Sequence, residues 1–376
     1  MKKIALIGST GSIGRQVLNV VRRHSDKFKI VSLSAGSNTN LFLEQVLEFN
    51  PKVATCANPV SVENINGTEF FFGENAFTNA IISEADVVVV SLVGFKGIIA
   101  VLDAISKGKN IALANKESLV VGGHVVMKLA KEKGVSIVPI DSEHSAIWQA
   151  LDFNYDREFS KIILTASGGA FRDKSKEELS VLKAKDALKH PNWDMGAKIT
   201  IDCATLVNKG FEVIEARWLY NCSFDKIDVI VHRESIIHSM VEFCDGAVLA
   251  QMSYPTMELP IQLALTYPNR LNADIKSLDF ASLKSLTFSK PDTDRFPLLN
   301  TVISAGKKGG CYPAVVNGAN EEAVRLFLND KIAFPEIYSV ISGALDAFSG
   351  DNSGSIESLF SADKFSRDFV KNKFGV

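Results

Sequence analysis

The sequence predicts an α/β protein with a doubly wound parallel sheet at its N-terminus, a central α/β domain and a C-terminal helical bundle. Two observations predict the first part. Short, valine-rich apolar segments alternate with helical segments through roughly the first 140 residues, which is typical of parallel strands buried between two layers of helices. The first of these strands, residues 3–7, leads into a glycine-rich turn followed by an amphipathic helix.

The glycine turn at residues 8–14 has the spacing Gly-x-Thr-Gly-x-x-Gly, close to the Gly-x-Gly-x-x-Gly of Rossmann-like dinucleotide folds. Glycines let the backbone approach a pyrophosphate, and the start of the next helix presents amides to it. The second strand, residues 29–33, ends in a segment without an acidic residue, where an NAD enzyme places an acid for the ribose 2′-hydroxyl. The sequence therefore favours NADP.

Further strands are expected at residues 52–57, 86–92, 110–114 and 135–140, with helices at 41–49 and 95–106. Because ligands bind at the carboxyl ends of parallel strands, the polar residues 115–118 and 141–144 are site candidates. Asp141 and Glu143 are two residues apart, so strand alternation would direct both carboxylates to one face, where they could hold Mg²⁺ or Mn²⁺. Two solvated loop acids are the alternative for such a pair.

The segment 190–219 begins with a histidine that is followed by a tryptophan, a methionine and a glycine. A strand is expected at residues 198–202, followed by a helix that Asn208, Lys209 and Glu212 open. An amide, an ammonium and a carboxylate at a helix start suit a phosphorylated ligand with a metal nearby. Taken alone, these residues would equally suit a solvated helix surface.

The rest of the chain adds a second sheet and helices. Residues 161–165 form an expected strand before a glycine-rich loop that contains Ser167, and residues 226–231 form another. Residues 239–244 and 247–252 read as a hairpin around an Asp-Gly turn. Residues 269–297 read as a linker, and helical spacing follows at 298–305, 314–329, 335–349 and 356–371, with Asn320 expected to cap a helix start.

The composition is that of an ordinary globular protein, with 46% hydrophobic and 22% charged residues among 376. A net charge of −2 gives no electrostatic reason to expect nucleic acid or an anionic membrane as a partner. Five widely spaced cysteines without a Cys-x-x-Cys pair argue against a disulfide framework and fit a reducing cytosol. We therefore expect a cytoplasmic protein without a membrane span.

Six motifs in order make the sequence similar to a known family. They are Gly-Ser-Thr-Gly-Ser-Ile-Gly, Ala-Asn-Lys-Glu-Ser, Ile-Asp-Ser-Glu-His-Ser-Ala-Ile, Thr-Ala-Ser-Gly-Gly-Ala-Phe, His-Pro-Asn-Trp-Asp-Met-Gly and Asn-Lys-Gly-Phe-Glu-Val-Ile-Glu-Ala. Together they resemble the 1-deoxy-D-xylulose 5-phosphate reductoisomerases, which make 2-C-methyl-D-erythritol 4-phosphate in non-mevalonate isoprenoid biosynthesis. The strong motifs lie between residue 1 and about Pro268, and the helical C-terminus fits the family more loosely.

The resemblance implies roles for individual residues. One divalent metal, Mn²⁺ or Mg²⁺ with Co²⁺ as a further option, would be bound by Asp141, Glu143 and Glu212. Substrate would contact Ser142, Glu143, Ser167, His190, Trp193, Cys203, Asn208, Lys209 and Glu212. NADPH would contact Thr10, Gly11, Ser12, Ile13, Gly36, Ser37, Asn38, Asn115, Lys116, Glu117 and Gly196. The implied catalytic residues are Lys116, His190 and Glu143.

Cys203 and His190 differ from the other positions in what the resemblance implies for them. Cys203 stands at a phosphate-binding position that is usually serine in the family, and a thiol is a weaker hydrogen-bond donor than a hydroxyl. His190 matches the histidine of a loop that closes over substrate, with Trp193 and Met195 as its apolar lid. The family reaction is a metal-assisted rearrangement of the carbon skeleton followed by hydride transfer from NADPH.

The resemblance also implies a division of the chain and a homodimer. The expected parts are residues 1–141 for NADPH, 142–268 for catalysis, metal, substrate and the dimer contact, 269–297 as linker and 298–376 as a helical domain. The alternative enzyme is a simple NADP-dependent dehydrogenase of the homoserine dehydrogenase type, which needs no three-carboxylate metal site. A cofactor-sensing module without catalysis would explain the glycine turn alone.

Overall fold

The computed structural model describes every residue except 63–64, 66, 188–194 and 376. The described chain forms two compact units. The first consists of Met1–Ser118, Val126–Ser145 and Thr256–Ile275. The second consists of Leu119–Val125, Ala146–Pro255 and Lys276–Val376.

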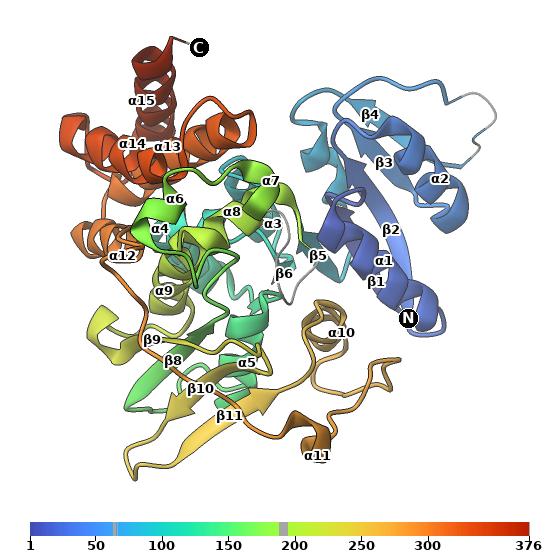
Figure 1. Cartoon of the computed structure of the whole chain (residues 1–376). Helices are drawn as coiled ribbons and strands as arrows, with labels where there is room; N and C mark the ends of the chain where they lie inside the picture. Colours follow the sequence, from blue (N-terminus) through green and yellow to red (C-terminus); the bar gives the residue numbers. More distant parts are fainter. Residues whose placement is uncertain (63–64, 66, 188–194, 376) are drawn as a thin grey trace. The chain divides into compact units, whose positions relative to one another are not determined.

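The first unit is built on a seven-stranded parallel sheet with the order β4-β3-β2-β1-β5-β6-β7 (Figure 1). Its strands are β1 (Lys2–Ile7), β2 (Phe28–Ala35), β3 (Val53–Cys56), β4 (Glu69–Phe72), β5 (Val87–Val90), β6 (Asn110–Leu113) and β7 (Ile137–Pro139). Strand order reverses direction between β1 and β5, and open parallel sheets bind ligands at such a switch point. The predicted doubly wound sheet is confirmed, and the edge strand β4 was not expected.

Helices cover this sheet. They are α1 (Ser12–Arg23), α2 (Thr39–Phe49), the 3₁₀ helix η1 (Ala76–Ala80), α3 (Gly97–Ser106) and α10 (Glu258–Thr266). Helices α4 (Glu117–Lys133) and α5 (Ser142–Ala150) follow β6 and β7, and each is divided between the two units. In α1 the apolar residues repeat with helical spacing, so that Val17, Leu18 and Val21 are buried against the sheet.

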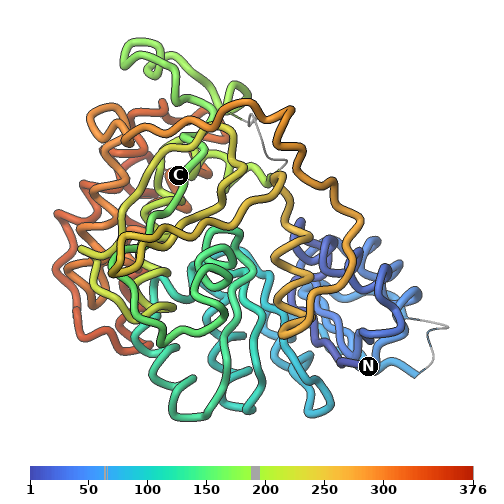
Figure 2. Tube along the Cα trace, turned by 90° about the horizontal axis from the view of Figure 1, so that it is seen from below, coloured from blue at the N-terminus to red at the C-terminus, as the bar shows by residue number. Residues whose placement is uncertain are grey.

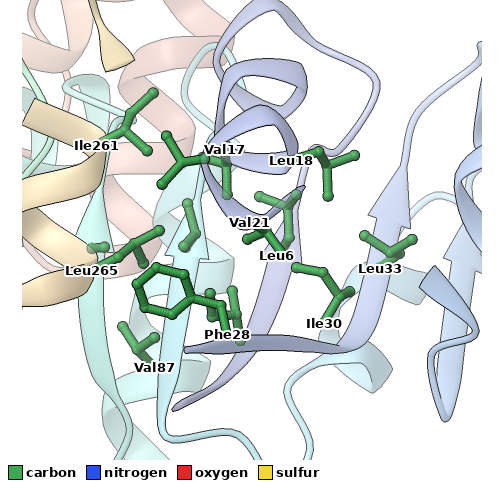
Figure 3. Packing of buried hydrophobic residues seen from close by; sticks show 14 of the residues in the cluster. Leu6, Val17, Leu18, Val21, Phe28, Ile30, Leu33, Val87, Ile261 and Leu265 are labelled. Atoms are coloured by element: carbon green, nitrogen blue, oxygen red, sulfur yellow. The ribbon is translucent and has the colours of Figure 1, made fainter. Parts of the chain in front are cut away.

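Helix α10 comes from a distant part of the sequence and packs on α1. Figure 2 follows this segment as it returns beside the N-terminal part of the chain. Ile261 and Leu265 are fully buried and join the cluster that contains Phe28 (Figure 3). The Lys2 ammonium also donates to the Leu265 carbonyl at 2.6 Å, and burial lowers the pKa of this lysine.

The second unit contains a four-stranded mixed sheet with the order β11-β10-β8-β9. Its strands are β8 (Lys161–Ala166), β9 (Ile227–Val231), β10 (Ile237–Glu242) and β11 (Val248–Met252). Strands β8 and β9 are parallel, whereas β10 is antiparallel to both of its neighbours. The predicted hairpin is therefore confirmed, and Asp245 stabilises its turn by accepting a hydrogen bond from the Ala247 amide at 3.0 Å.

The remaining helices also belong to this unit. They are α6 (Lys176–Leu179), α7 (Ala184–Ala187), α8 (Ala197–Ala204), α9 (Val207–Leu219), η2 (Phe224–Lys226), α11 (Phe280–Leu283), α12 (Leu298–Lys308), α13 (Tyr312–Leu328), α14 (Phe334–Ala347) and α15 (Ile356–Phe374). The four long C-terminal helices were predicted to within a few residues at each end. Among the described helices, none combines the length and apolar character needed to cross a membrane.

Two local predictions in this unit are wrong. Residues 198–202 belong to helix α8 and not to a strand, and the ion pair of Lys198 with Asp202 at 2.7 Å has the i, i+4 spacing that a helix provides. Asn320 does not cap a helix start, because α13 begins at Tyr312 with Pro313 in its first turn. Asn320 instead lies inside that helix and is fully buried.

We predict that Leu265→Ala lowers the free energy of unfolding by about 2–5 kcal/mol, because it leaves a cavity in a fully buried position. Leu47→Ala on α2 is the control, since Leu47 is 66% exposed and its truncation should change stability by less than about 0.5 kcal/mol. Denaturant unfolding checks both variants. Equal effects would contradict the placement of α10 in this core.

Candidate functional site

The glycine turn lies between β1 and α1, at the switch point of the sheet. Gly8 has φ +97°, and a Cβ there would lie 2.8 Å from the carbonyl oxygen of Ser91. The turn therefore requires glycine and brings the backbone of β1 close to the end of β5. The predicted cofactor residues of this turn occupy its exposed or half-buried part at the start of α1: Thr10, Gly11, Ser12 and Ile13.

The next predicted cofactor residues, Gly36, Ser37 and Asn38, are exposed between β2 and α2. Asn38 caps α2, because its side-chain oxygen accepts a hydrogen bond from the Leu41 amide at 3.3 Å. A neutral cap at this point leaves no carboxylate to repel a ribose 2′-phosphate.

Side chains of the segment after β6 fix it to neighbouring parts of the chain. Asn115 donates to the carbonyls of Leu92 and Gly94, each at 3.0 Å, and to the carboxylate of Glu117 at 2.9 Å. Lys116 is buried, and its ammonium lies 3.1 Å from Asp141. The three predicted residues of this segment are thus fixed next to the end of β7.

Asp141 and Glu143 are brought together by a helix start. Asp141 follows β7, and its Oδ1 accepts hydrogen bonds from the amides of Glu143 at 3.1 Å and His144 at 3.4 Å. Glu143 lies in the first turn of α5, with the Ser142 hydroxyl donating to it. The prediction that strand alternation aligns the two carboxylates is therefore wrong, although the pair itself converges. The amides at the helix start stabilise negative charge there.

Glu212 lies one turn into α9 and is 1% exposed. Asn208 donates to its Oε1 at 2.6 Å, and the Lys209 ammonium pairs with its Oε2. The prediction that these three residues open a helix is confirmed. All three are buried, so the alternative of a solvated helix surface is wrong.

The three predicted metal ligands form one group. One carboxylate oxygen of each of Asp141, Glu143 and Glu212 lies within 4.8 Å of the others. Such clustering of like charges is costly unless cations offset it, and a divalent ion that prefers oxygen ligands suits it. The donor set therefore fits a hard divalent cation such as Mg²⁺ or Mn²⁺.

The glycine-rich loop after β8 lies against the end of α8. Gly169 has φ +75°, and a Cβ there would lie 2.5 Å from the carbonyl oxygen of Cys203. Ser167 accepts a hydrogen bond from the Gly169 amide at 3.2 Å, and Arg172 donates to the Ser167 carbonyl at 2.7 Å. The loop residue Ser167 and the helix residue Cys203 are thereby brought into one region, as an anion site would require.

Two arginines near this loop, Arg172 and Arg233, both pair with Asp173. Burial lowers the pKa of Arg172, and the neighbouring Arg233 guanidinium lowers it further. The pair with Arg233 lowers the pKa of the Asp173 carboxyl group. Asp173 therefore offsets part of the charge of the two guanidinium groups near the Ser167 loop.

The remaining predicted residues divide into two groups. Gly196 is the exposed N-cap residue of α8, and Met195 is half-buried just before it. His190 and Trp193 lie outside the described residues. The sequence also did not reveal the contact between Asp202 and Asn320, although the i, i+4 spacing of Lys198 and Asp202 was a signal that residues 198–202 are helical.

Two other histidines, His232 and His238, are buried and lie within hydrogen-bond distance of neighbouring groups. His232 is fully buried, and its Nδ1 lies 2.9 Å from the Thr287 carbonyl oxygen. His238 is buried with Nε2 2.9 Å from the Ser253 hydroxyl.

Most of the chain matches one family. Residues 4–123 match 1-deoxy-D-xylulose 5-phosphate reductoisomerase, residues 137–220 match the C-terminal domain of that enzyme, and residues 252–369 match a DXP reductoisomerase C-terminal domain. The reductoisomerase of Pelotomaculum thermopropionicum is 48% identical over 98% of this chain and 97% of its own length. Reductoisomerase 1 of Bacillus thuringiensis is 46% identical over 98% of both chains.

Solved structures agree with these relatives. A DOX-P reductoisomerase in complex with NADPH, fosmidomycin and magnesium has a TM-score of 0.94 and 36% identity, covering 100% of this chain and 98% of that one. The Zymomonas mobilis reductoisomerase in complex with NADPH has a TM-score of 0.91 and 37% identity over 99% of both chains. The chain belongs to the 1-deoxy-D-xylulose 5-phosphate reductoisomerase family.

Proposed function

We propose that this chain converts 1-deoxy-D-xylulose 5-phosphate to 2-C-methyl-D-erythritol 4-phosphate with NADPH and a divalent cation. The observation that carries the proposal is the group formed by Asp141, Glu143 and Glu212 in a member of this family. When bound, the cation supplies Lewis acidity towards the ketone and its neighbouring hydroxyl, and NADPH supplies the hydride. A simple dehydrogenase of the homoserine dehydrogenase type has no need for three converging carboxylates.

The substrate's phosphate is assigned to residues at the start of α9 and at the Ser167 loop. Lys209 offers an ammonium and Asn208 an amide at the start of a helix whose end already favours anions. Ser167 offers a hydroxyl, and Cys203 offers only a weak thiol donor. The remaining proposed substrate contacts are Ser142, Glu143, His190, Trp193 and Glu212.

The proposed catalytic residues are Lys116, His190 and Glu143, and proton transfer is assigned to Lys116 and His190. Lys116 is 8% exposed, and its ammonium lies 3.1 Å from Asp141, so it can hold a proton next to the metal carboxylates. His190 is proposed from the family resemblance alone. A closed, water-poor site would protect reactive fragments during the rearrangement.

NADPH is assigned to residues 1–141, together with Gly196. Its pyrophosphate would lie at the glycine turn, where the start of α1 presents backbone amides at the switch point of the sheet. Ser37 and Asn38 would face the 2′-phosphate as neutral donors, and Asn115, Lys116 and Glu117 would lie further along the cofactor.

We predict that the protein oxidises NADPH in the presence of 1-deoxy-D-xylulose 5-phosphate, and that a chelator stops the reaction until Mg²⁺ or Mn²⁺ is restored. Absorbance at about 340 nm follows NADPH, and product analysis identifies the reduced sugar phosphate. Glu212→Gln should lower kcat/KM more than about a hundredfold, because even indirect support of a metal ligand is worth 10–100-fold.

Glu132→Gln is the control for that variant, since it makes the same chemical change at an exposed position on α4. Calorimetric titration with Mn²⁺ should show weaker binding in Glu212→Gln only. Retention of most of the rate in Glu212→Gln would favour the simple dehydrogenase instead.

We predict that Cys203→Ser lowers KM for the sugar phosphate by about threefold to tenfold with kcat unchanged, because a hydroxyl bonds an anion better than a thiol does. Steady-state kinetics at saturating NADPH measures the change. Cys244→Ser is the matched control, because Cys244 is an exposed free thiol after β10. An unchanged KM in Cys203→Ser would remove this residue from the phosphate site.

We also propose that the protein is a homodimer that uses the edge strand β11. Val248 and Leu249 on this strand are 46% and 45% exposed, which is unusual for neighbouring apolar residues at a sheet edge. Sedimentation equilibrium should give about twice the 40.9 kDa chain mass, and Leu249→Lys should shift the equilibrium towards the monomer. A monomeric wild type would contradict this proposal.

A further inference from the structure

We propose that Asn320 is a positioning residue for the phosphate group of the substrate, acting through Asp202 and helix α8. The proposal rests on the phosphate assignment made above and extends it to a helix with no assigned role. Asn320 lies in α13, and its amide nitrogen donates to Asp202 Oδ1 at 2.8 Å across 118 positions of sequence.

The contact joins two buried side chains. Asn320 is 0% exposed and Asp202 is 2% exposed. The other carboxylate oxygen of Asp202 pairs with the Lys198 ammonium at 2.7 Å. A buried carboxylate held from two sides is costly to leave half-paired, so α8 is tied to α13 at this point.

Helix α8 in turn carries the phosphate residues. Asp202 directly precedes Cys203, whose carbonyl oxygen lies against Gly169 of the Ser167 loop. After α8 the chain turns at Leu206, with φ 63°, into the start of α9, which carries Asn208 and Lys209. A shift at Asp202 would therefore displace the loop and the start of α9 together.

Helix α13, which carries Asn320, is itself held by α15. It packs along α15, and Arg367 of α15 lies 2.6 Å from Glu321 and 2.7 Å from Asp363. Asn320 precedes Glu321, so the residue that holds Asp202 is next to the one that α15 holds. Arg367 thus connects α15 to α13, and Asn320 connects α13 to α8, which precedes the proposed phosphate residues.

The amide of Asn320 is held in this position at a cost. Within the described part of the chain, its side-chain oxygen is buried and has no hydrogen-bond partner. A buried carbonyl without a partner is unfavourable, which the contact with Asp202 must outweigh. An apolar residue would fill the same space on α13 without that cost, but it would leave Asp202 without this donor.

Asn317 supplies a matched control on the same helix. It is also 0% exposed, and its side-chain oxygen also lacks a partner among the described residues. Its amide donates to Glu321 at 3.0 Å and not to Asp202. Asn317→Ala and Asn320→Ala therefore make the same change at equal burial, and only the second removes the contact with α8.

The test is steady-state kinetics of the full chain with NADPH, metal and the sugar phosphate. Asn320→Ala should raise KM for the sugar phosphate about tenfold, the effect of one buried bond to a charged group. Its kcat and its KM for NADPH should change less than about twofold, because phosphate contacts act alike in the ground and transition states. Asn317→Ala should leave all three near wild type.

Exchange of the two partners tests the pair directly. Asn320→Asp alone places a carboxylate against Asp202 and should raise KM further than alanine does. Adding Asp202→Asn restores an amide–carboxylate pair, although it removes the carboxylate from Lys198, so KM should fall clearly below that of Asn320→Asp alone. Thermal unfolding of each variant shows which samples are folded.

Calorimetric titration with inorganic phosphate gives a reading that needs no turnover. Its Kd should rise in Asn320→Ala and stay unchanged in Asn317→Ala. A folded Asn320→Ala variant with wild-type KM and phosphate Kd would overturn the inference, as would equal effects in both alanine variants. If the wild type does not turn over the sugar phosphate, the proposed function fails, and the phosphate titration still decides the role of Asn320.

Discussion

Mutual repulsion of three carboxylates is the constraint on which this structure depends. Asp141, Glu143 and Glu212 present oxygens within 4.8 Å of one another, although a folded chain normally keeps like charges apart. The amides at the start of α5 face Asp141, and the side chains of Asn208 and Lys209 hold Glu212. The nearby backbone and side chains thus balance a charge cluster that is arranged for a divalent cation.

Much of the fold and of the site could be predicted from the sequence. The buried strands of the parallel sheet appear as uninterrupted apolar runs, and the glycine turn is readable because Gly8 has a backbone conformation and a neighbour that exclude other residues. The metal residues were predicted through motifs, and the convergence of their carboxylates confirms that grouping. The local reason given for Asp141 and Glu143 was wrong, because a helix begins where a strand was assumed to continue.

What could not be predicted depends on contacts between distant residues. Residues 198–202 alternate in polarity like a strand, yet Lys198 and Asp202 pair along a helix, and Asp202 finds its second partner 118 positions later. Asparagine is a common helix cap, so the sequence neighbours of Asn320 suggested a helix start. Its observed contact is with Asp202, which no local pattern reveals. Periodicity reports the local chain only, so tertiary partners override it.

The return of α10 to the first unit has a consequence for how the protein is made. Ile261 and Leu265 belong to the same core cluster as Phe28, so the N-terminal sheet lacks part of its cover until the ribosome has passed residue 265. Contacts of such long separation form late and leave apolar surface open to aggregation in the meantime. A fragment that ends before residue 256 would lack α10 and would leave the apolar cluster around Phe28 partly uncovered.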